Sequence, residues 1–474
     1  MHGSRHRVIF RFAAFATALG LAATLATAPA ARADTAGACA PDWAPFGGAG
    51  ANATVRAMIR YEVSSGGGIG EQLYVGGEFT TIDGVAVNGI ARWEGTSWQS
   101  VAGGVSGTGF QMGVHALAVF DDGTGSALYA AGRFQFAGAT PADGIARWDG
   151  HAWTAVGAGT LAPAGSIINA LVVHDDGTGP ALYAAGSFTS IGGVAASRIA
   201  KWNGTQWTPL GAGLGSSGYC LASMGSGASA RLIVGGIFVN AGGAPAVEIA
   251  QWDGAAWAPM GAGLGGLGVY SLAIYDEGHG AGPQLFAGGD FTGSGSPGYA
   301  RIARWNGTAW TGLTASGGGA NSGVYALGVF DDEAGAGPAL YAGGFFTTVS
   351  GVPASCIARW DGTAWTALGA GTVGGGVFEL FGIPSASGAP ATLLVGGNFN
   401  TAGGVPASGL AQWQGCIAPS CAPADLDCDG AVNGADLGLL LAAWGPCSGC
   451  NADINGDGLV DGADLGLLLA AWTG

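Results

Sequence analysis

The sequence contains few charged residues and a single lysine, Lys201. Only 10% of its 474 residues are Asp, Glu, Lys or Arg, and 31 acidic residues outnumber 15 basic ones, so the formal net charge is −16 at pH 7. Proteins bind nucleic acids and anionic membranes mainly through clustered Lys and Arg side chains. We therefore expect no nucleic-acid partner and no anionic membrane surface as a partner.

Long apolar runs are also missing from the sequence beyond its N-terminal segment. Residues 12–28 form one apolar run that follows a basic segment and ends at Ala31-Arg32-Ala33. This pattern is typical of a cleaved secretory signal, because the run is short for a helix of ~20 residues that spans a bilayer. Cleavage of residues 1–33 removes four arginines and no acidic residue, which changes the formal charge from −16 to −20. We expect a secreted chain, extracellular or attached to the cell surface, with no membrane span after signal cleavage; a retained N-terminal anchor is the alternative.

Tryptophan, in contrast, recurs in a regular pattern. Six pairs of tryptophans are five residues apart, and the first members of successive pairs follow one another every 50–55 residues. A further tryptophan, Trp413, has no downstream partner, and Trp43 has no upstream partner. The complete pairs are Trp93/Trp98, Trp148/Trp153, Trp202/Trp207, Trp252/Trp257, Trp305/Trp310 and Trp360/Trp365. This spacing predicts seven repeats, the seventh assembled from both ends of the chain.

Each repeat predicts four short β-strands. In the sixth repeat, runs of alternating apolar and polar residues are separated by turn residues such as Asp361-Gly362, which tolerate the positive φ of tight hairpins. The runs are residues 324–330, 339–344, 356–360 and 364–369. A unit of ~50 residues with four strands is typical of a propeller blade. We expect a mainly β fold over residues 34–416, a seven-bladed β-propeller of four-stranded blades that is closed by an N-terminal strand around Trp43.

The repeats resemble those of kelch-type propellers. The resemblance rests on the tryptophan of the fourth strand and on a double glycine after the second strand, and it covers roughly residues 43–416. The double glycines are Gly76-Gly77, Gly235-Gly236, Gly288-Gly289, Gly343-Gly344 and Gly396-Gly397, with Ala131-Gly132 and Ala185-Gly186 in two repeats. The resemblance implies an architecture and not an activity, since propellers carry many functions.

Two cysteines flank the predicted closure of the ring. Aligned on an intact repeat, Cys39 and Cys416 both fall where the turn between the third and fourth strands would be. We predict a Cys39–Cys416 disulfide in place of this missing turn; pairing of Cys416 with Cys421 is the alternative. Cys220 and Cys356 are expected to be buried thiols that act as small hydrophobic residues.

A short linker, residues 417–424, leads to a segment rich in aspartate. In two stretches, oxygen-bearing side chains occupy positions 1, 3, 5, 9 and 12, with glycine at position 6 and a backbone carbonyl at position 7, which is typical of an EF-hand-type calcium loop. The predicted ligands of two Ca²⁺ ions are Asp425, Asp427, Asp429, Ala431, Asn433 and Asp436 in the first loop, and Asp453, Asn455, Asp457, Leu459, Asp461 and Asp464 in the second. Each loop is followed by apolar residues at helical spacing.

Residues 425–474 resemble a type I dockerin, which has two loop–helix units without an entering helix. The resemblance implies a small α domain that folds with calcium and docks onto a cohesin-like partner. Two positions depart from the family, because Gly434-Ala435 replaces a Ser-Thr pair and Leu441-Ala442 replaces a Lys-Arg pair, with the same changes in the second unit. The apolar residues there either form a hydrophobic docking face or pack the two helices together. Cys421, Cys428, Cys447 and Cys450 are expected to form two disulfides, with a zinc site as the alternative.

We find no catalytic constellation in the sequence. The arginines of the third strands recur at one repeat position and are interpreted as structural, and four acidic pairs in hairpin turns are interpreted as solvated. These pairs are Asp121/Asp122, Asp175/Asp176, Asp276/Glu277 and Asp331/Asp332. The residue x of the Gly-Gly-x-Phe segment varies between repeats, which is expected either of a ligand-binding ring or of relaxed strand ends. Its polar members give the candidate ligand-binding residues Glu78, Arg133, Asp290 and Asn398.

These features together predict a secreted, non-catalytic binding or scaffold protein. Its propeller would bind a glycan or a protein, and its calcium-folded tail would dock it to a partner or a surface. The alternative is a glycan-degrading, O-glycosyl hydrolase-type component of an extracellular polysaccharide-degrading assembly, which would need paired carboxylates ~5–9 Å apart on the ligand face. A third hypothesis is a structural protein whose tail packs on its own propeller.

Overall fold

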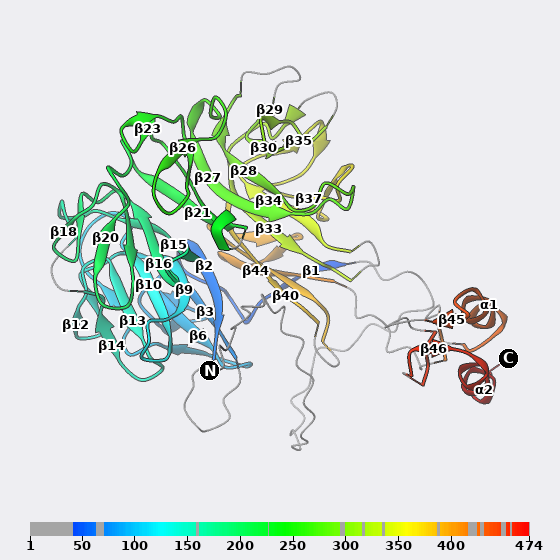
Figure 1. The fold of residues 1–474 in the computed structure, drawn as a ribbon. Helices are drawn as coiled ribbons and strands as arrows, with labels where there is room; N and C mark the ends of the chain where they lie inside the picture. Colours follow the sequence, from blue (N-terminus) through cyan, green and yellow to red (C-terminus); the bar gives the residue numbers. More distant parts are fainter. Residues whose placement is uncertain are drawn as a thin grey trace, which may run out of the picture. The chain divides into compact units, whose positions relative to one another are not determined.

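The computed structural model describes residues 41–62, 71–157, 161–225, 227–293, 299–314, 318–333, 337–385, 389–415, 424–426, 431–446, 452–455 and 457–473. Within these residues the chain is mainly β and contains seven four-stranded antiparallel sheets (Figure 1). Six of the sheets follow one another along the sequence. The seventh combines three late strands with the first strand of the described chain, so the arrangement is propeller-like.

The strands of the seven sheets are, from the first to the fourth strand of each sheet, β2 (Val55–Tyr61), β3 (Gln72–Gly77), β6 (Ile90–Trp93) and β7 (Trp98–Ser100); β9 (Gly113–Asp121), β10 (Ser126–Arg133), β13 (Ile145–Trp148) and β14 (Trp153–Ala155); β15 (Ile168–Asp175), β16 (Pro180–Gly186), β19 (Ile199–Trp202) and β20 (Trp207–Pro209); β21 (Gly218–Met224), β22 (Arg231–Gly236), β25 (Ile249–Trp252) and β26 (Trp257–Pro259); β27 (Gly266–Tyr275), β28 (Gln284–Phe291), β30 (Ile302–Trp305) and β31 (Trp310–Thr311); β33 (Val324–Phe330), β34 (Ala339–Gly344), β37 (Ile357–Trp360) and β38 (Trp365–Ala367); and β40 (Val377–Ile383), β41 (Thr392–Gly397), β44 (Leu410–Gln414) and β1 (Asp42–Pro45).

Shorter strands decorate the loops, mostly between the second and third strands of a sheet. They are β4 (Thr81–Ile82), β5 (Val85–Ala86), β8 (Val105–Ser106), β11 (Phe136–Ala137), β12 (Thr140–Pro141), β17 (Ser190–Ile191), β18 (Val194–Ala195), β23 (Asn240–Ala241), β24 (Ala244–Pro245), β29 (Tyr299–Ala300), β32 (Gly318–Gly319), β35 (Thr348–Val349), β36 (Val352–Pro353), β39 (Thr372–Val373), β42 (Thr401–Ala402) and β43 (Val405–Pro406), with one 3₁₀ helix, η1 (Gly227–Ser229).

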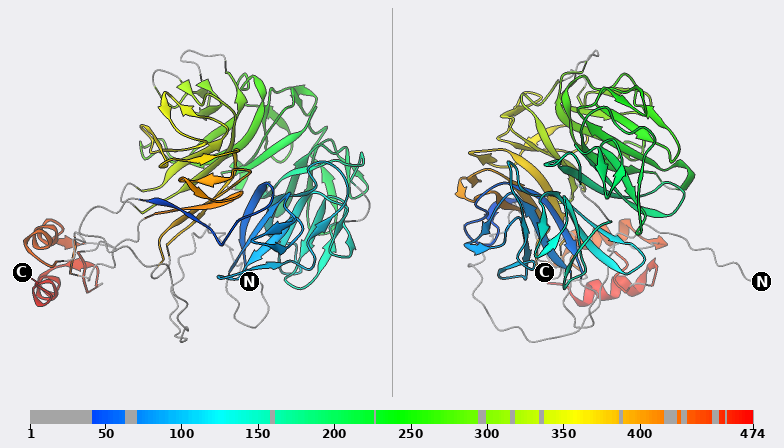
Figure 2. Two further views of the ribbon diagram at one scale, coloured as in Figure 1. Left: turned by 180° about the vertical axis from the view of Figure 1, so that it is seen from behind. Right: turned by 90° about the vertical axis from the view of Figure 1, so that its left-hand side faces the viewer.

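The N-terminal strand completes the seventh sheet, as the split tryptophan pair predicts. Strand β1 pairs antiparallel with β44 and places Trp43 opposite Trp413 (Figures 1 and 2). The indole nitrogen of Trp43 donates a hydrogen bond to the carbonyl oxygen of Leu368 at 2.7 Å. Trp207 makes the equivalent bond, to Val156 at 3.2 Å, within the continuous part of the chain. Trp43 therefore has the same role as a fourth-strand tryptophan that lies in an unbroken repeat.

The first strands of the sheets contact one another in a closed cycle. In order they are β2, β9, β15, β21, β27, β33 and β40, and β40 contacts β2 again. Glycines of the second strands permit this close approach. A Cβ atom added to Gly76 would lie 2.7 Å from Val114 of the next sheet, and one added to Gly396 would lie 2.7 Å from Val55. The contact between Gly396 and Val55 joins the last sheet to the first, so the double glycines predicted from sequence serve the packing between sheets.

The acidic pairs of the hairpin turns are not simply solvated, so this expectation was wrong. The second member of each pair is nearly buried, with 6–9% of its side chain exposed, and bonds to a cation of the third strand. The ion pairs are Asp122–Arg147, Asp176–Lys201, Glu277–Arg304 and Asp332–Arg359. Burying an unpaired carboxylate is costly, and the regularly placed third-strand cation offsets this cost. The structural interpretation of these arginines agrees with the ion pairs.

The C-terminal segment contains two helices with identical sequences. Helix α1 (Gly434–Ala442) and helix α2 (Gly462–Ala470) each begin at a capping box, and a short pair joins β45 (Gly445–Pro446) to β46 (Leu459–Val460). Leu440 and Leu468 are fully buried in the small core that the helices share. In contrast, Leu441 and Leu469 are each 52% exposed. Of the two alternatives for this apolar position, the described residues favour an outward face over packing between the helices.

The cysteine predictions are tested only in part. Cys220 and Cys356 are free thiols and both are buried, as predicted. Cys39, Cys416, Cys421, Cys428, Cys447 and Cys450 lie outside the described residues. The Cys39–Cys416 disulfide and the pairing of the tail cysteines therefore remain predictions. In the part of the chain that the structure describes, no helix is both long and apolar enough to cross a bilayer.

We predict that Trp43→Ala destabilises the ring as much as Trp207→Ala does. Both side chains are buried and donate equivalent hydrogen bonds, so each change should lower the free energy of unfolding by about 3–5 kcal/mol. Denaturant unfolding followed by tryptophan fluorescence measures both variants. A Trp43→Ala protein as stable as wild type, beside a destabilised Trp207→Ala protein, would contradict closure by the N-terminal strand.

Candidate functional site

Each of the seven sheets has a β-bulge at the start of its first strand. In every sheet the register between the first and second strands skips one residue of the first strand. A bulged residue is left out of the hydrogen-bond ladder, and its side chain is redirected. The skipped residues, here called the bulge ring, are Arg56, His115, Asn169, Tyr219, Tyr270, Tyr325 and Phe378.

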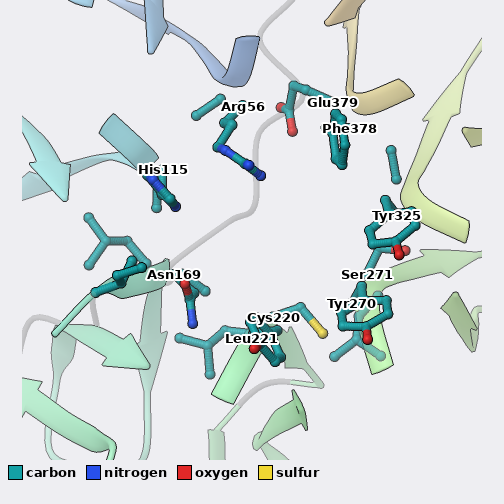
Figure 3. Close-up of a pocket in the computed structure, with 18 of the residues that line it drawn as sticks. Arg56, His115, Asn169, Cys220, Leu221, Tyr270, Ser271, Tyr325, Phe378 and Glu379 are labelled. Atoms are coloured by element: carbon teal, nitrogen blue, oxygen red, sulfur yellow. The ribbon is translucent and has the colours of Figure 1, made fainter. Parts of the chain in front are cut away.

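The bulge ring surrounds a cavity of about 670 Å³, which we call the central cavity (Figure 3). All seven bulged residues line it, together with residues that follow them on the first strands. A second layer consists of Ala57, Ala116, Ala170, Cys220, Ser271, Ala326 and Glu379. A third layer is apolar and includes Met58, Leu117, Leu171, Leu221 and Leu272. The volume lies within the range of about 300–1,000 Å³ typical of small-molecule sites.

One side of the central cavity is aromatic. The rings of Tyr270 and Tyr325 stack with centroids 4.8 Å apart and planes 9° apart, and Tyr219 packs edge-on against Tyr270 at 5.4 Å. Tyr325 also contacts Phe345 at 5.6 Å and Phe378 at 5.4 Å. We call these five residues the aromatic arc. Because they come from four neighbouring sheets and support one another, they form a continuous apolar surface in the cavity wall.

The other side of the cavity is polar and carries little free charge. Arg56 donates from its Nε atom to the carboxylate of Glu78 at 2.6 Å, and its guanidinium lies 5.1 Å from the ring centroid of Phe378. Burial, together with the charge of Arg56, lowers the pKa of His115 to about 4, so this imidazole is neutral at pH 7. Asn169 donates from its side-chain amide to the carbonyl oxygen of Gly218 at 2.9 Å.

Two side chains of the second layer supply hydrogen-bonding oxygen atoms below the aromatic arc. Ser271 is 8% exposed, and its hydroxyl has no hydrogen-bond partner among the described residues. Glu379 faces the cavity and keeps part of its surface accessible. Desolvation by the surrounding protein raises the pKa of Glu379 to about 8, against the opposing effect of the Met58 backbone N–H. The carboxyl group is therefore mostly protonated at pH 7 and both donates and accepts hydrogen bonds.

The four candidate residues predicted from the Gly-Gly-x-Phe segments lie outside this wall. Glu78 holds Arg56, and Asp290 forms an ion pair with Arg301 at 3.0 Å. Asn398 accepts a hydrogen bond from the backbone N–H of Gly376 at 2.7 Å. Arg133 donates to the carbonyl oxygen of Phe110 at 2.7 Å and lines a separate cavity of about 270 Å³. A ligand role for these four residues stays a prediction.

Sequence reasoning missed the bulge ring. The same x position does contribute Ser187 and Phe345 to the central cavity, so the predicted face was partly informative. The missed signal is the second residue of each first strand, which ranges from arginine to tyrosine while its neighbours remain alanine, valine or leucine in most repeats. Divergence at one position within otherwise uniform strands identifies the candidate site.

The second predicted calcium loop is held by hydrogen bonds from carboxylates to backbone amides. Asp453 accepts from the N–H groups of Asp457 and Gly458, at 3.0 and 2.8 Å. Asp464 accepts from Ile454 and Asn455 with one oxygen and from Asp461 with the other. These backbone bonds, that from Asp461 foremost, lower the pKa of Asp464. The loop is thus preshaped around ionised carboxylates.

The donor set of this loop fits calcium chemically, since its side chains offer oxygen atoms and Ca²⁺ prefers six to eight oxygen ligands. Among the described residues, however, no group of three or more His, Cys, Asp or Glu side chains lies close enough to hold a metal ion. In the first loop, Asp427 and Asp429 lie outside the described residues. Calcium binding therefore stays a prediction for both loops.

Comparison with known proteins identifies no family. No family model matches the chain, and no curated protein matches it significantly. Among solved structures, the chain is similar to the extracellular domain of the proposed hybrid two-component system BT4673 from B. thetaiotaomicron, with 10% identity and a TM-score of 0.44, over 79% of this chain and 40% of that chain. It is also similar to BBS1N in complex with ARL6DN, with 11% identity and a TM-score of 0.43, over 79% of this chain and 97% of that chain.

A third similar structure is an ancestral GH74 enzyme, with 12% identity and a TM-score of 0.32, over 76% of this chain and 49% of that chain. The chain thus spans less than half the length of the first and third of these structures. Similarity at this level establishes no shared activity. The description of the fold rests instead on the pairing of the strands.

We predict that Glu379→Gln makes the protein more stable than wild type at pH 8 and equally stable near pH 4.5. The pKa of Glu379 is about 8 in the folded protein against 4.5 ordinarily, so between these values the folded state keeps a proton that the unfolded state has released. The stability associated with the protonated acid is complete below pH 4.5 and is lost as the pH rises through 8, whereas glutamine does not titrate. Denaturant midpoints of both proteins from pH 4.5 to 8.5 measure the effect. A pH-independent difference would refute it.

Proposed function

We propose that this protein is a secreted, non-catalytic glycan-binding protein. The seven sheets are the blades of one kelch-type propeller, which binds its ligand in the central cavity, and the tail is a calcium-folded, dockerin-like module. The observation that carries the proposal is the bulge ring, which gathers one variable side chain from each sheet around one cavity. A position that is free of both the ladder and the packing between sheets is suited to recognition.

The chemistry of the cavity wall favours a glycan over a protein segment. A sugar ring has an apolar face of C–H groups and a rim of hydroxyl groups, so it is matched by aromatic faces beside hydrogen-bonding side chains. The aromatic arc supplies the first, and Asn169, Ser271 and Glu379 supply the second. A concave site of about 670 Å³ also suits a compact ligand better than the broad surface that a protein partner needs.

Binding without hydrolysis is favoured over the glycan-degrading alternative. Glycosidases of the retaining and inverting types use two carboxyl groups about 5–9.5 Å apart. Of the described residues that line the central cavity, Glu379 alone carries a carboxyl group. Glu78 lies behind Arg56 and is engaged with it. The geometry therefore supports recognition, and release of reducing sugar in the binding experiment below would support the alternative.

The tail is proposed to dock the propeller to a cohesin-like partner or to a surface. Its two units expose matching apolar side chains: Leu439, Leu441 and Trp444 in one, and Leu467, Leu469 and Trp472 in the other, each 40–52% exposed. Apolar side chains gathered at corresponding positions of two copies are typical of an interaction face. Where the dockerin family has charged residues, this face is hydrophobic, so its partner is expected to present an apolar surface.

We predict that a glycan array identifies ligands and that Tyr325→Ala weakens their binding by roughly 5- to 30-fold. Loss of an aromatic platform corresponds to about 1–2 kcal/mol. The control is Val329→Ala, which changes an exposed residue of the same strand, β33, outside the cavity wall. Isothermal titration calorimetry with the tightest array ligand measures both variants. An array without bound glycans, or a Tyr325→Ala protein with wild-type affinity, would refute the proposed site.

We predict that the full-length protein binds two Ca²⁺ ions after treatment with chelator. Asp425→Ala and Asp453→Ala should each remove one ion, because each removes the carboxylate at position 1 of one loop, and the double variant should bind none. Calorimetric stoichiometry is the measurement. Asp253→Ala is the control, since this aspartate caps a turn of the ring through the N–H groups of Ala255 and Ala256. Undiminished binding by the double variant would exclude these loops.

A further inference from the structure

The central cavity is enclosed on its sides. Its wall is built from the first strands of all seven sheets, and these strands contact one another in a closed cycle. A ligand can therefore enter along the axis of the ring and not across the wall. A polymer that lies across the face of the ring keeps most of its length outside the cavity, whereas a chain end or a branch can enter it.

The second layer of the cavity offers hydrogen bonds on one side only. Ser271 and Glu379 belong to strands β27 and β40, and Ala326 of strand β33 lies between them in the layer. They follow Tyr270 and Phe378 of the aromatic arc directly in sequence, so a group that passes the arc meets both oxygen-bearing side chains (Figure 3). The remaining five members of the layer are alanine or cysteine.

The hydroxyl of Ser271 points to a ligand. It is 92% buried and has no hydrogen-bond partner among the described residues. A buried hydroxyl without a partner is unfavourable by about 1–3 kcal/mol in mutational data, and such groups are uncommon in folded proteins. Because Ser271 lines the central cavity, a hydroxyl group of a bound ligand can supply the partner that the protein does not.

The depth of the polar site is limited by the third layer. Met58, Leu117, Leu171, Leu221 and Leu272 line the cavity beyond Ser271 and Glu379. A sugar that moved past the second layer would lose water from its hydroxyl groups against apolar side chains, which is unfavourable. Polar recognition therefore ends at the second layer, and the site accommodates a terminal unit better than a chain that threads through the ring.

The titratable groups that face the cavity give it little net charge. Arg56 is paired with Glu78, His115 is neutral at pH 7, and the carboxyl group of Glu379 is mostly protonated. An acidic sugar would find no unpaired cation there to replace its lost hydration. The formal charge of −16 on the whole chain also opposes approach of a polyanion.

We propose that the central cavity binds the end of a neutral glycan chain, with the terminal sugar against the aromatic arc and its hydroxyl groups bonded to Ser271 and Glu379. The proposal rests on the glycan-binding function proposed above and narrows it in two respects. It specifies a neutral sugar rather than a uronic acid. It also specifies a chain end rather than an internal segment.

Calorimetric titration of the full-length protein tests the preference for neutral sugars. The neutral probes are the hexasaccharides of the cello, xylo, manno and malto series, and the acidic probe is oligogalacturonate of similar length. The best neutral probe should bind at least about tenfold more tightly than the acidic one. Equal or tighter binding of oligogalacturonate overturns the preference but leaves glycan binding standing, whereas failure of every glycan to bind overturns both.

Competition against the soluble polysaccharide of the same linkage tests end recognition. A protein that binds chain ends is inhibited equally by hexasaccharide and polysaccharide at equal numbers of chains, so the polysaccharide is a far weaker competitor at equal mass. A protein that binds internal segments is inhibited about equally at equal mass. The second result overturns the proposal for chain ends.

Variants of the second layer test the assigned contacts. Ser271→Ala should weaken binding of the best neutral probe by about 2- to 12-fold, the effect of one neutral hydrogen bond. Glu379→Gln keeps a neutral donor and acceptor and should stay within about threefold of wild type. Cys220→Ala is the matched control, since it alters the same layer away from Ser271 and Glu379 and should change affinity less than twofold. Thermal unfolding confirms that each variant is folded, and a folded Ser271→Ala protein with wild-type affinity overturns the assigned contact.

Discussion

The ring depends on one repeated steric contact, in which a glycine of a second strand meets a large residue on the first strand of the next sheet. Gly76 meets Val114, and Gly396 meets Val55, so the same contact that joins neighbouring sheets also joins the last sheet to the first. Interiors this closely packed tolerate little added volume. Where the second strand carries Ala185 instead of glycine, the facing residue is Gly218. The pair of volumes is conserved although the residues exchange places, which keeps the spacing of the sheets uniform.

Uniform spacing has a consequence for function. Because every first strand is held at a similar distance from its neighbours, the seven bulged residues meet around one cavity instead of spreading over the surface. The residues that flank each bulge are constrained by the ladder and by packing between sheets, whereas the bulged residue is released from the ladder. The ring therefore separates the positions that hold the fold from the positions that determine recognition. Arg56, Asn169 and Tyr270 can differ without any change in the strands that carry them.

Local sequence patterns predict most of this ring and little of its site. Tryptophan spacing indicates where the third and fourth strands lie, and the unpaired Trp43 and Trp413 indicate which strands must meet, because these signals repeat at a fixed interval. The cavity could not be predicted in this way, since a bulge is a property of register between two strands and leaves no residue type of its own. The same limit explains the acidic turns. Asp122 looks like an ordinary turn residue until the pairing of strands brings Arg147 beside it.

The ring and the tail are stabilised by different interactions, and this difference bears on how the protein would work. Apolar packing and buried ion pairs hold the ring, with Asp176 and Lys201 2.8 Å apart as one example, and neither needs a bound ion. In the tail, the carboxylates of Asp453 and Asp464 organise the loop through backbone N–H groups, and further carboxylates crowd the same loop. Like charges at short range repel one another unless a cation lies between them. The fold of the tail should therefore respond to calcium while the central cavity does not, so attachment and ligand recognition can be controlled separately within one chain.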